Sequence, residues 1–353
     1  MLIASLAAGA ELCHAQSVNY MVYTLTVGDS SASLANGVMF DGQFIWLGIR
    51  NPDGGVIVKM TTSGAVLSTT PVGVDPDEMA FDGTNVWMTD FLGNDVAIVD
   101  PNGNLVKTIP LAPSTNPAGP ANPEGIVFDG HSMWVANDGP YANVVTKIDV
   151  STQGIVGTYA VGRAPDAMGF DGTHIWVGNS NSNSVWLLDP DTGAIWNGFA
   201  TGTFPSDMVY DGANMWVGNG PAANVGIGSV TKIRAADGLI IGNYQVGNQV
   251  RGLADDGTSI WVCNEGSSSV TRLRASNAAV MGTFATGLQP RGVVFDGSKI
   301  WISNSGENTL TIIAPPGATV GQPLAAAPSV TVTQTTPVPA TIVSQWLDFI
   351  INN

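Results

Sequence analysis

The chain has 353 residues, of which 43 are glycine and only 11% are charged, against about 25% in an average globular protein. It carries 28 acidic and 12 basic residues, a formal net charge of −16 at pH 7. This balance argues against a nucleic-acid partner, because binding to phosphates needs a basic surface. Solubility outside the cell is a sufficient reason for the acidic excess.

Residues 1–15 have the composition of a signal peptide that lacks its basic first part. An apolar stretch leads to Cys13-His14-Ala15, which places small residues where a cut after Ala15 would need them. We therefore expect a secreted or periplasmic protein. Removal of this segment would leave Cys263 as the remaining thiol, so no disulfide framework is expected.

One motif then recurs along the chain, with an Asp-Gly pair followed by a tryptophan. The seven copies have their aspartates at Asp41, Asp82, Asp129, Asp171, Asp211, Asp256 and Asp296. The tryptophan always comes five residues later, at Trp46, Trp87, Trp134, Trp176, Trp216, Trp261 and Trp301. Successive copies are 40 to 47 residues apart, a spacing typical of four-stranded propeller blades. The sequence therefore predicts an all-β fold, a single seven-bladed β-propeller.

The fourth copy shows how one blade is expected to fold. Residues 165–170 and 175–177 predict two strands joined by a tight turn, in which Gly172 supplies a positive φ. Residues 184–188 and 194–200 predict the third and fourth strands, joined by a second turn at residues 189–193. One blade is thus one four-stranded antiparallel meander.

The two ends of the repeat region predict how the ring closes. Residues 20–28 match the fourth strand of other blades, whereas the last blade, residues 292–314, has three strands before Pro315-Pro316. We expect the N-terminal strand to complete the last blade, which removes exposed sheet edges. The propeller should then span residues 18–314.

The repeat resembles a known family at the residues that define it. Phe170-Asp171-Gly172, Ile175-Trp176-Val177 and Asn179, followed by Ser184-Val185 and Thr192-Gly193, are similar to YVTN/NHL-type β-propeller repeats of secreted bacterial proteins. The pattern is similar, more distantly, to streptogramin-type lyases, which depend on His and Glu at the central site. Here His131 and His174 follow Asp-Gly turns on the opposite face, which argues against lyase chemistry. The resemblance implies architecture, since such propellers serve as lyases, lactonases, enzyme subunits and binding modules.

Differences between blades point to the face of the channel mouth, where the loops into strand one gather. The residues after the repeat proline form a ring there: Asn36, Asp77, Glu124, Asp166, Ser206, Arg251 and Arg291. With Glu78 and Asp207 added, the mouth is acidic across blades two to five and basic across blades six and seven. It could seat a bipolar ligand, a peptide or a cation. Alternatively, the opposite charges pair with one another across the ring.

Aromatic residues extend this candidate site. Phe91 and Tyr141 lie in loops near Glu78 and Glu124, beside a long proline-rich connection at residues 111–123. We expect these aromatics to line a ligand pocket, with an inert insertion as the alternative.

Other recurrent residues are interpreted as structural. The tryptophans are expected in the core, each with a small residue two positions later, and Cys263 fills one of these small slots as a buried thiol. The asparagines three residues after most tryptophans, such as Asn179, are expected to bind their own loops. Because amide and carboxylate oxygens are also the ligands that Ca²⁺ prefers, a bound divalent cation is kept as an alternative.

The C-terminal part changes in composition. Residues 315–340 are rich in Pro, Ala and Thr and predict a linker, and residues 341–353 predict a short helix or tail that is too short to span a bilayer. We expect no transmembrane span and a monomer.

The functional prediction is a non-catalytic scaffold or recognition module that binds a protein, peptide or glycan at the channel mouth, without a cofactor. The alternative is a metal-assisted lactonase, gluconolactonase or lyase, in which mouth carboxylates hold a divalent cation. A third hypothesis is a subunit of a periplasmic redox enzyme.

Overall fold

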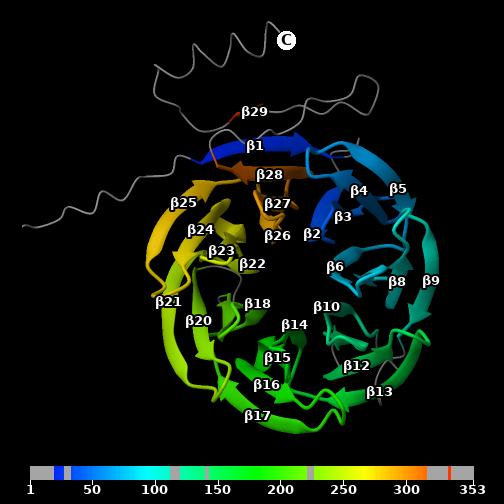
Figure 1. Ribbon diagram of the computed structural model, residues 1–353, viewed down its shortest axis with the longest axis vertical. Helices are drawn as coiled ribbons and strands as arrows, with labels where there is room; N and C mark the ends of the chain where they lie inside the picture. The colour runs from blue at the N-terminus through cyan, green and yellow to red at the C-terminus, as the bar shows by residue number, and fades with distance from the viewer. Residues whose placement is uncertain are drawn as a thin grey trace, which may run out of the picture.

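Seven antiparallel sheets form a closed ring around a central opening in the computed structural model (Figure 1). The structure describes residues 20–27, 33–111, 120–139, 143–220, 226–315 and 333–334. This is the seven-bladed, four-stranded propeller that the repeat predicts.

In six blades the strands run outward from the channel in chain order, and in the last blade β1 follows β28. The innermost strands are β2 (Leu34–Phe40), β6 (Pro76–Phe81), β10 (Pro123–Phe128), β14 (Pro165–Phe170), β18 (Pro205–Tyr210), β22 (Val250–Asp255) and β26 (Pro290–Phe295). The second strands are β3 (Phe44–Arg50), β7 (Val86–Asp90), β11 (Ser132–Asn137), β15 (Ile175–Asn179), β19 (Asn214–Asn219), β23 (Ser259–Asn264) and β27 (Ile300–Asn304). Two short 3-10 turns, η1 (Ser180–Ser182) and η2 (Glu265–Ser267), follow β15 and β23.

The outer half of each blade holds the third and fourth strands. The third strands are β4 (Val56–Thr61), β8 (Asp95–Val99), β12 (Val144–Asp149), β16 (Ser184–Leu188), β20 (Ile227–Arg234), β24 (Ser269–Arg274) and β28 (Thr309–Ala314). The outermost strands are β5 (Val66–Pro71), β9 (Leu105–Pro110), β13 (Gly154–Ala160), β17 (Ile195–Ala200), β21 (Ile240–Asn248), β25 (Val280–Ala285) and β1 (Met21–Thr26).

The strand β1 closes the ring, as predicted. It pairs antiparallel with β28, from Met21 opposite Ala314 to Thr26 opposite Thr309. The last blade also gains a short fifth strand, β29 (Thr333–Gln334), on the free edge of β1 (Figure 1). The rest of the predicted linker and the predicted tail at 341–353 lie outside the described residues, as does the predicted signal peptide.

The Asp-Gly turn and the tryptophan form one unit in every blade. In the fourth blade, one carboxylate oxygen of Asp171 accepts the backbone N–H groups of Thr173 and His174 at 2.7 Å. Its other oxygen accepts the indole N–H of Trp176 at 2.8 Å. The same indole bond recurs in all seven blades at 2.7–2.8 Å. Gly172 has φ +91° with open space beside it, so the turn has the conformation that the sequence predicts.

The tryptophans form the core between blades. All seven are at most 1% exposed, and each packs in an apolar cluster with residues of a neighbouring blade. The small residues two positions later contact the first strand of the next blade: Thr89, for example, donates a hydrogen bond to the carbonyl of Glu124. Core packing of the tryptophans is thereby confirmed, and the small residues make room for a neighbouring strand.

No helix within the described ranges is long and apolar enough to cross a membrane.

Candidate functional site

A bulge at the start of each innermost strand positions the candidate residues. In β14, Pro165 pairs with Asn179 and Met168 pairs with Val177, so two residues of β14 lie opposite Gly178 alone. Equivalent register shifts occur at the start of all seven innermost strands. Because a bulge redirects the side chains of its strand, the residue after each repeat proline is presented to the channel.

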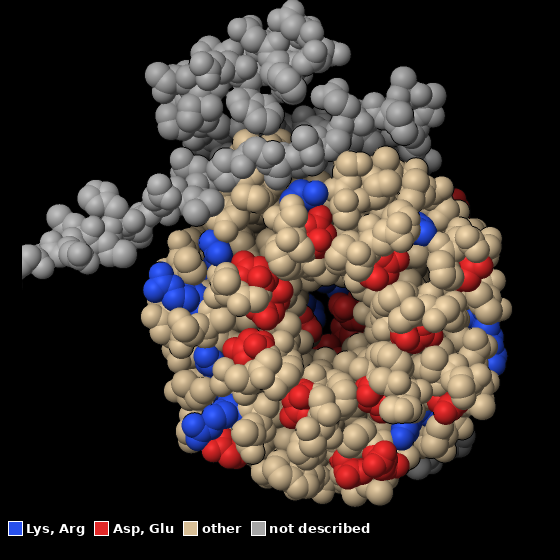
Figure 2. Space-filling view, viewed as in Figure 1, with Lys and Arg blue, Asp and Glu red and all other residues tan. Residues whose placement is uncertain are grey.

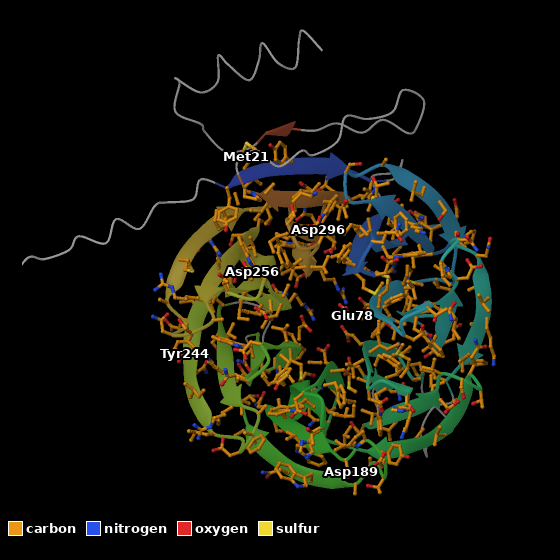
Figure 3. The ribbon with its side chains drawn as sticks, in the orientation of Figure 1. Met21, Glu78, Asp189, Tyr244, Asp256 and Asp296 are labelled. Atoms are coloured by element: carbon orange, nitrogen blue, oxygen red, sulfur yellow. The ribbon has the colours of Figure 1, made fainter. Side chains whose placement is uncertain are left out.

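These side chains meet in the central channel. A cavity of about 50 Å³ is lined by Glu78, Glu124, Asp166, Asp207, Arg251 and Arg291, together with small residues and two apolar residues, Ile126 and Met168, of the same strands. Glu78 lies at the edge of the central opening in Figure 3, and Figure 2 shows acidic side chains inside and around this opening. Ser206 also lines the cavity and Asp77 contacts Arg291 beside it, so eight of the nine residues predicted at the mouth are neighbours. A space of this size holds a few water molecules or the tip of a ligand.

Arg291 joins opposite sides of the channel. Its guanidinium donates to Asp77 at 2.7 Å and to Glu124 at 3.3 Å, although β26 lies in blade seven and these partners lie in blades two and three. Although burial opposes it, Asp77 and Glu124 raise the pKa of Arg291, which stays charged. The predicted pairing across the ring therefore occurs at Arg291.

Arg251 is paired within its own blade. Its Nε donates to Glu265 at 2.9 Å, and Gln249 donates to the same carboxylate oxygen at 3.0 Å. Glu265 follows β23, so the loop between the second and third strands completes the mouth. The guanidinium groups of Arg251 and Arg291 face more carboxyl groups than they can neutralise, because five carboxyl groups contribute to the channel.

The uncompensated carboxyl groups hold their protons more tightly than usual. Burial raises the pKa of Glu78 to about 8, and the charges of Asp77 and Asp207 add to this effect. Burial raises the pKa of Asp207 to about 7, although the backbone N–H groups of Leu253 and Met208 oppose it. Burial also raises the pKa of Glu124 and of Asp166. The titration of Glu78 and Asp207 therefore falls near neutral pH.

Two further carboxyl groups at the mouth were missed by the sequence analysis. Burial and the charge of Glu124 raise the pKa of Asp138 to about 7, and Glu265 holds Arg251. Each directly follows a recurrent asparagine, Asn137 or Asn264. The position after that asparagine was the signal that could have found them.

The predicted aromatic pocket receives less support. Phe91 lies in the turn between β7 and β8, its backbone binds Asp75 and Asn122, and it is not among the residues that line the channel cavity. Tyr141 lies outside the described residues. The aromatic contribution to the site stays a prediction.

The recurrent asparagines bind their own blades. The amide of Asn304 donates to Thr309 and Thr311 at 2.9 Å, and that of Asn264 donates to Thr271 at the same distance. Among the described residues, no group of three or more His, Cys, Asp or Glu side chains is placed to hold a metal ion. Arg291 instead occupies the space between Asp77 and Glu124, where two carboxylates could otherwise share a cation.

The described residues with familiar catalytic chemistry lie away from the channel cavity. His131 and His174 belong to Asp-Gly turns. Cys263 is buried, and burial raises the pKa of its thiol well above the ordinary value, which disfavours a reactive thiolate. The channel carboxyl groups with raised pKa values are the residues of the site that could transfer a proton.

The ring and its charged channel place the chain in the class of seven-bladed β-propellers with a polar central channel. No family model matches the sequence, and no curated protein matches it. Among solved structures, a chain of hydrazine synthase from Kuenenia stuttgartiensis is similar, with 20% identity, a TM-score of 0.67, and 88% of this chain and 99% of that chain covered. A streptogramin B lyase structure is similar with 16% identity, a TM-score of 0.65, and 84% and 98% covered. At these identities the likeness concerns the fold alone.

Proposed function

We propose that this propeller is a secreted or periplasmic binding module, whose channel mouth takes a cationic group of a peptide or protein without catalysing a reaction. The observation that supports this most is the excess of carboxyl groups in the channel. Arg291 pairs with Asp77 and Glu124, and Arg251 pairs with Glu265, whereas Glu78, Asp166 and Asp207 form no ion pair with any described residue. This proposal is in keeping with the resemblance to YVTN/NHL-type repeats of secreted proteins.

The size of the cavity limits which ligands can enter the channel. About 50 Å³ leaves no room for a whole peptide, so a lysine side chain could enter only with its ammonium end. Ionised Glu78 and Asp166 would stabilise that ammonium, because charge-assisted hydrogen bonds are stronger than neutral ones. The rest of the ligand would then lie on the loops around the mouth, where Asp138 and Glu265 are found.

Calorimetric titration of the protein with a tri-lysine peptide tests the proposal. Asp166→Asn should weaken binding by about tenfold, whereas Asp191→Asn, the same charge change at an exposed turn, should leave it unchanged. An ε-acetylated tri-lysine should not bind. Equal weakening by the two substitutions would mean that the peptide responds only to net charge, and the channel proposal would be wrong.

An enzyme with an acid or base in the channel is the second candidate function. It is favoured by the pKa values of about 8 at Glu78 and about 7 at Asp207, because active sites hold carboxyl groups near the working pH. A metal-assisted lactonase or lyase belongs to this candidate, and so does a subunit of a larger redox enzyme. The arginine pairing at Asp77 and Glu124 fits a bound divalent cation poorly.

Metal analysis of the purified protein separates these candidates. A stoichiometric ion, together with a fall in melting temperature after a chelator is added, would favour the metal-assisted enzyme, because a bound ion stabilises the folded state. If neither is found, the metal-assisted form is set aside, and turnover of lactone substrates by wild type and Glu78→Gln remains the test of a metal-free enzyme.

A further inference from the structure

A second, larger hollow lies between blades five and six, on the face that carries the Asp-Gly turns. It has a volume of about 620 Å³. Its walls include Asp211 and Lys232 of blade five, and Asp255, Thr258, Arg274 and Met281 of blade six. None of these residues lines the channel cavity, so this groove is separate from the channel site.

The groove lies where the repeat is broken. The residue before the Asp-Gly pair is aromatic in six blades, at Phe40, Phe81, Phe128, Phe170, Tyr210 and Phe295. Each of these side chains packs against the apolar cluster that holds the tryptophan of the preceding blade. In blade six the position is Asp255, and the cluster around Trp216 has no such aromatic residue.

The groove between blades one and two serves as an internal comparison. It is built from the same positions, with Lys59 in the place of Lys232 and Phe81 in the place of Asp255, and its volume is about 290 Å³. Replacement of the aromatic ring by a short carboxylate therefore accompanies a groove of about twice the volume. The change also exchanges an apolar wall for a charged one.

The other charged groups of the groove are already engaged or lie at its rim. Asp211 accepts the indole N–H of Trp216 at 2.7 Å and two backbone N–H groups. Lys232 donates to the carbonyl of Ala275 at 2.6 Å and lies 4.5 Å from the centre of the Trp216 ring. Arg274 is exposed. Asp255 forms no ion pair with any described residue, and one of its oxygens accepts the backbone N–H of Gly257 at 2.9 Å.

We propose that this groove binds a small organic cation, with its ammonium or guanidinium group on Asp255 and its apolar stem against Met281 and Ala275. Burial and the charges of Asp211 and Asp256 disfavour an isolated carboxylate at Asp255, and a bound cation relieves this penalty. The hydroxyl group of Thr258, which donates to Asp256 at 2.7 Å, lines the same wall and offers a further acceptor. This site is independent of the channel function, because it lies on the opposite face.

Two sources carry this chemistry: a free amine, or a lysine or arginine side chain on the surface of a partner protein. Matched probes distinguish them. N-acetyl-lysine methylamide represents the peptide source, n-butylammonium represents the free amine, and N-acetyl-norleucine methylamide is the uncharged counterpart. The source whose probe binds more tightly to wild type is the one that the groove prefers.

Ligand-observed NMR titration of the full chain tests the proposal, with probes up to about 10 mM, since a single ion pair gives weak affinity. Wild type should bind at least one cation saturably and should not bind the norleucine derivative. Asp255→Asn and Asp255→Phe should each weaken the cation by about tenfold or more. Asp191→Asn, the same charge change at an exposed turn outside both sites, should leave this affinity unchanged.

The two Asp255 variants protect the test against misfolding. Asp255→Phe restores the residue type of six other blades and should melt at or above the wild-type temperature, whereas Asp255→Asn keeps the shape of the groove. The proposal is overturned if the cations bind both variants as tightly as wild type, if the norleucine derivative binds equally well, or if no probe binds saturably.

Discussion

The two ends of the innermost strand β18 use aspartate in opposite ways. At one end of β18, burial raises the pKa of Asp207 to about 7. At the other end, Asp211 also loses solvent, but its hydrogen bonds to Trp216 and Asn214 and to backbone N–H groups lower its pKa. Four residues apart, one carboxylate has enough donors to be a structural anion, and the other does not.

The repeat explains this difference. The Asp-Gly turn brings its own donors, so every blade satisfies its aspartate without help from another blade. The channel residues come from different blades and depend on one another, as Arg291 does on Asp77 and Glu124. The aspartates of the Asp-Gly turns, which find their hydrogen-bond donors within one blade, stabilise the ring. The channel carboxyl groups without such donors are available to a ligand.

The repeated unit should be the more costly one to break. Trp176→Ala removes a fully buried side chain and leaves Asp171 without its indole donor, so we expect the free energy of unfolding to fall by about 3–5 kcal/mol. Trp196→Ala is the matched control, because Trp196 is 54% exposed and stacks only on His174. Denaturant unfolding measures both. Equal losses would mean that the comparison between buried and exposed tryptophans has no energetic basis.

The channel should respond next to loss of a guanidinium. Arg291→Met leaves Asp77 and Glu124 buried without their cation, and we expect a loss of about 3 kcal/mol at pH 8. The loss should be smaller at pH 5, because burial raises the pKa of Glu124 and a protonated Glu124 needs no cation. Arg234→Met, which breaks an exposed pair with Asp237, should leave the melting temperature nearly unchanged at both pH values. A loss for Arg291→Met that does not depend on pH would point to packing instead of charge.

The smallest expected effect is a change in the pH dependence of stability. Because the pKa of Glu78 is about 8 in the folded chain, against an ordinary value of 4.5, the folded state keeps a proton that the unfolded state releases. Its contribution to stability is therefore present below about pH 4.5 and is lost as pH rises to about 8. Glu78→Gln removes this titration.

Melting temperatures of wild type and Glu78→Gln between pH 5 and pH 8 measure the effect. We expect the wild type to lose a few degrees more than the variant over this range, since a kcal/mol corresponds to about 2–4 °C in a domain of this size class. Parallel curves would show that folded Glu78 does not keep its proton over this pH range. The contrast between the channel carboxyl groups and Asp211 would then lose its support.

The architecture was predictable because each blade is specified by residues close together in the sequence. Predicted strands at 165–170 and 184–188 coincide with β14 and β16, and the closing role of residues 20–28 follows from a missing fourth strand. The bond between Asp171 and Trp176 was not predicted, although their constant spacing was visible. A spacing shows that two residues belong together, but it does not show whether they touch.

The sequence predicted which residues lie at the channel better than it predicted which of them pair. The residue after each repeat proline was identified as a mouth residue, but the bulge that presents it depends on register with the second strand, and sequence does not show register. Arg291 and its partner Asp77 lie 214 residues apart in the sequence, so no local pattern indicates their contact. Asp138 and Glu265 were missed although their charged neighbours Glu124 and Arg251 lie in the same blades, because sequence does not show which loop residues reach the channel.

The pairing of β1 with β28 affects how the protein can fold during its synthesis on the ribosome. The strand made first has its hydrogen-bond partner at residues 309–314, near the end of the repeat region. At roughly 5–20 residues per second, that partner emerges only after tens of seconds. Throughout this time β1 lacks its partner strand, so a chaperone that shields strand edges would act on the nascent chain until the final blade is complete.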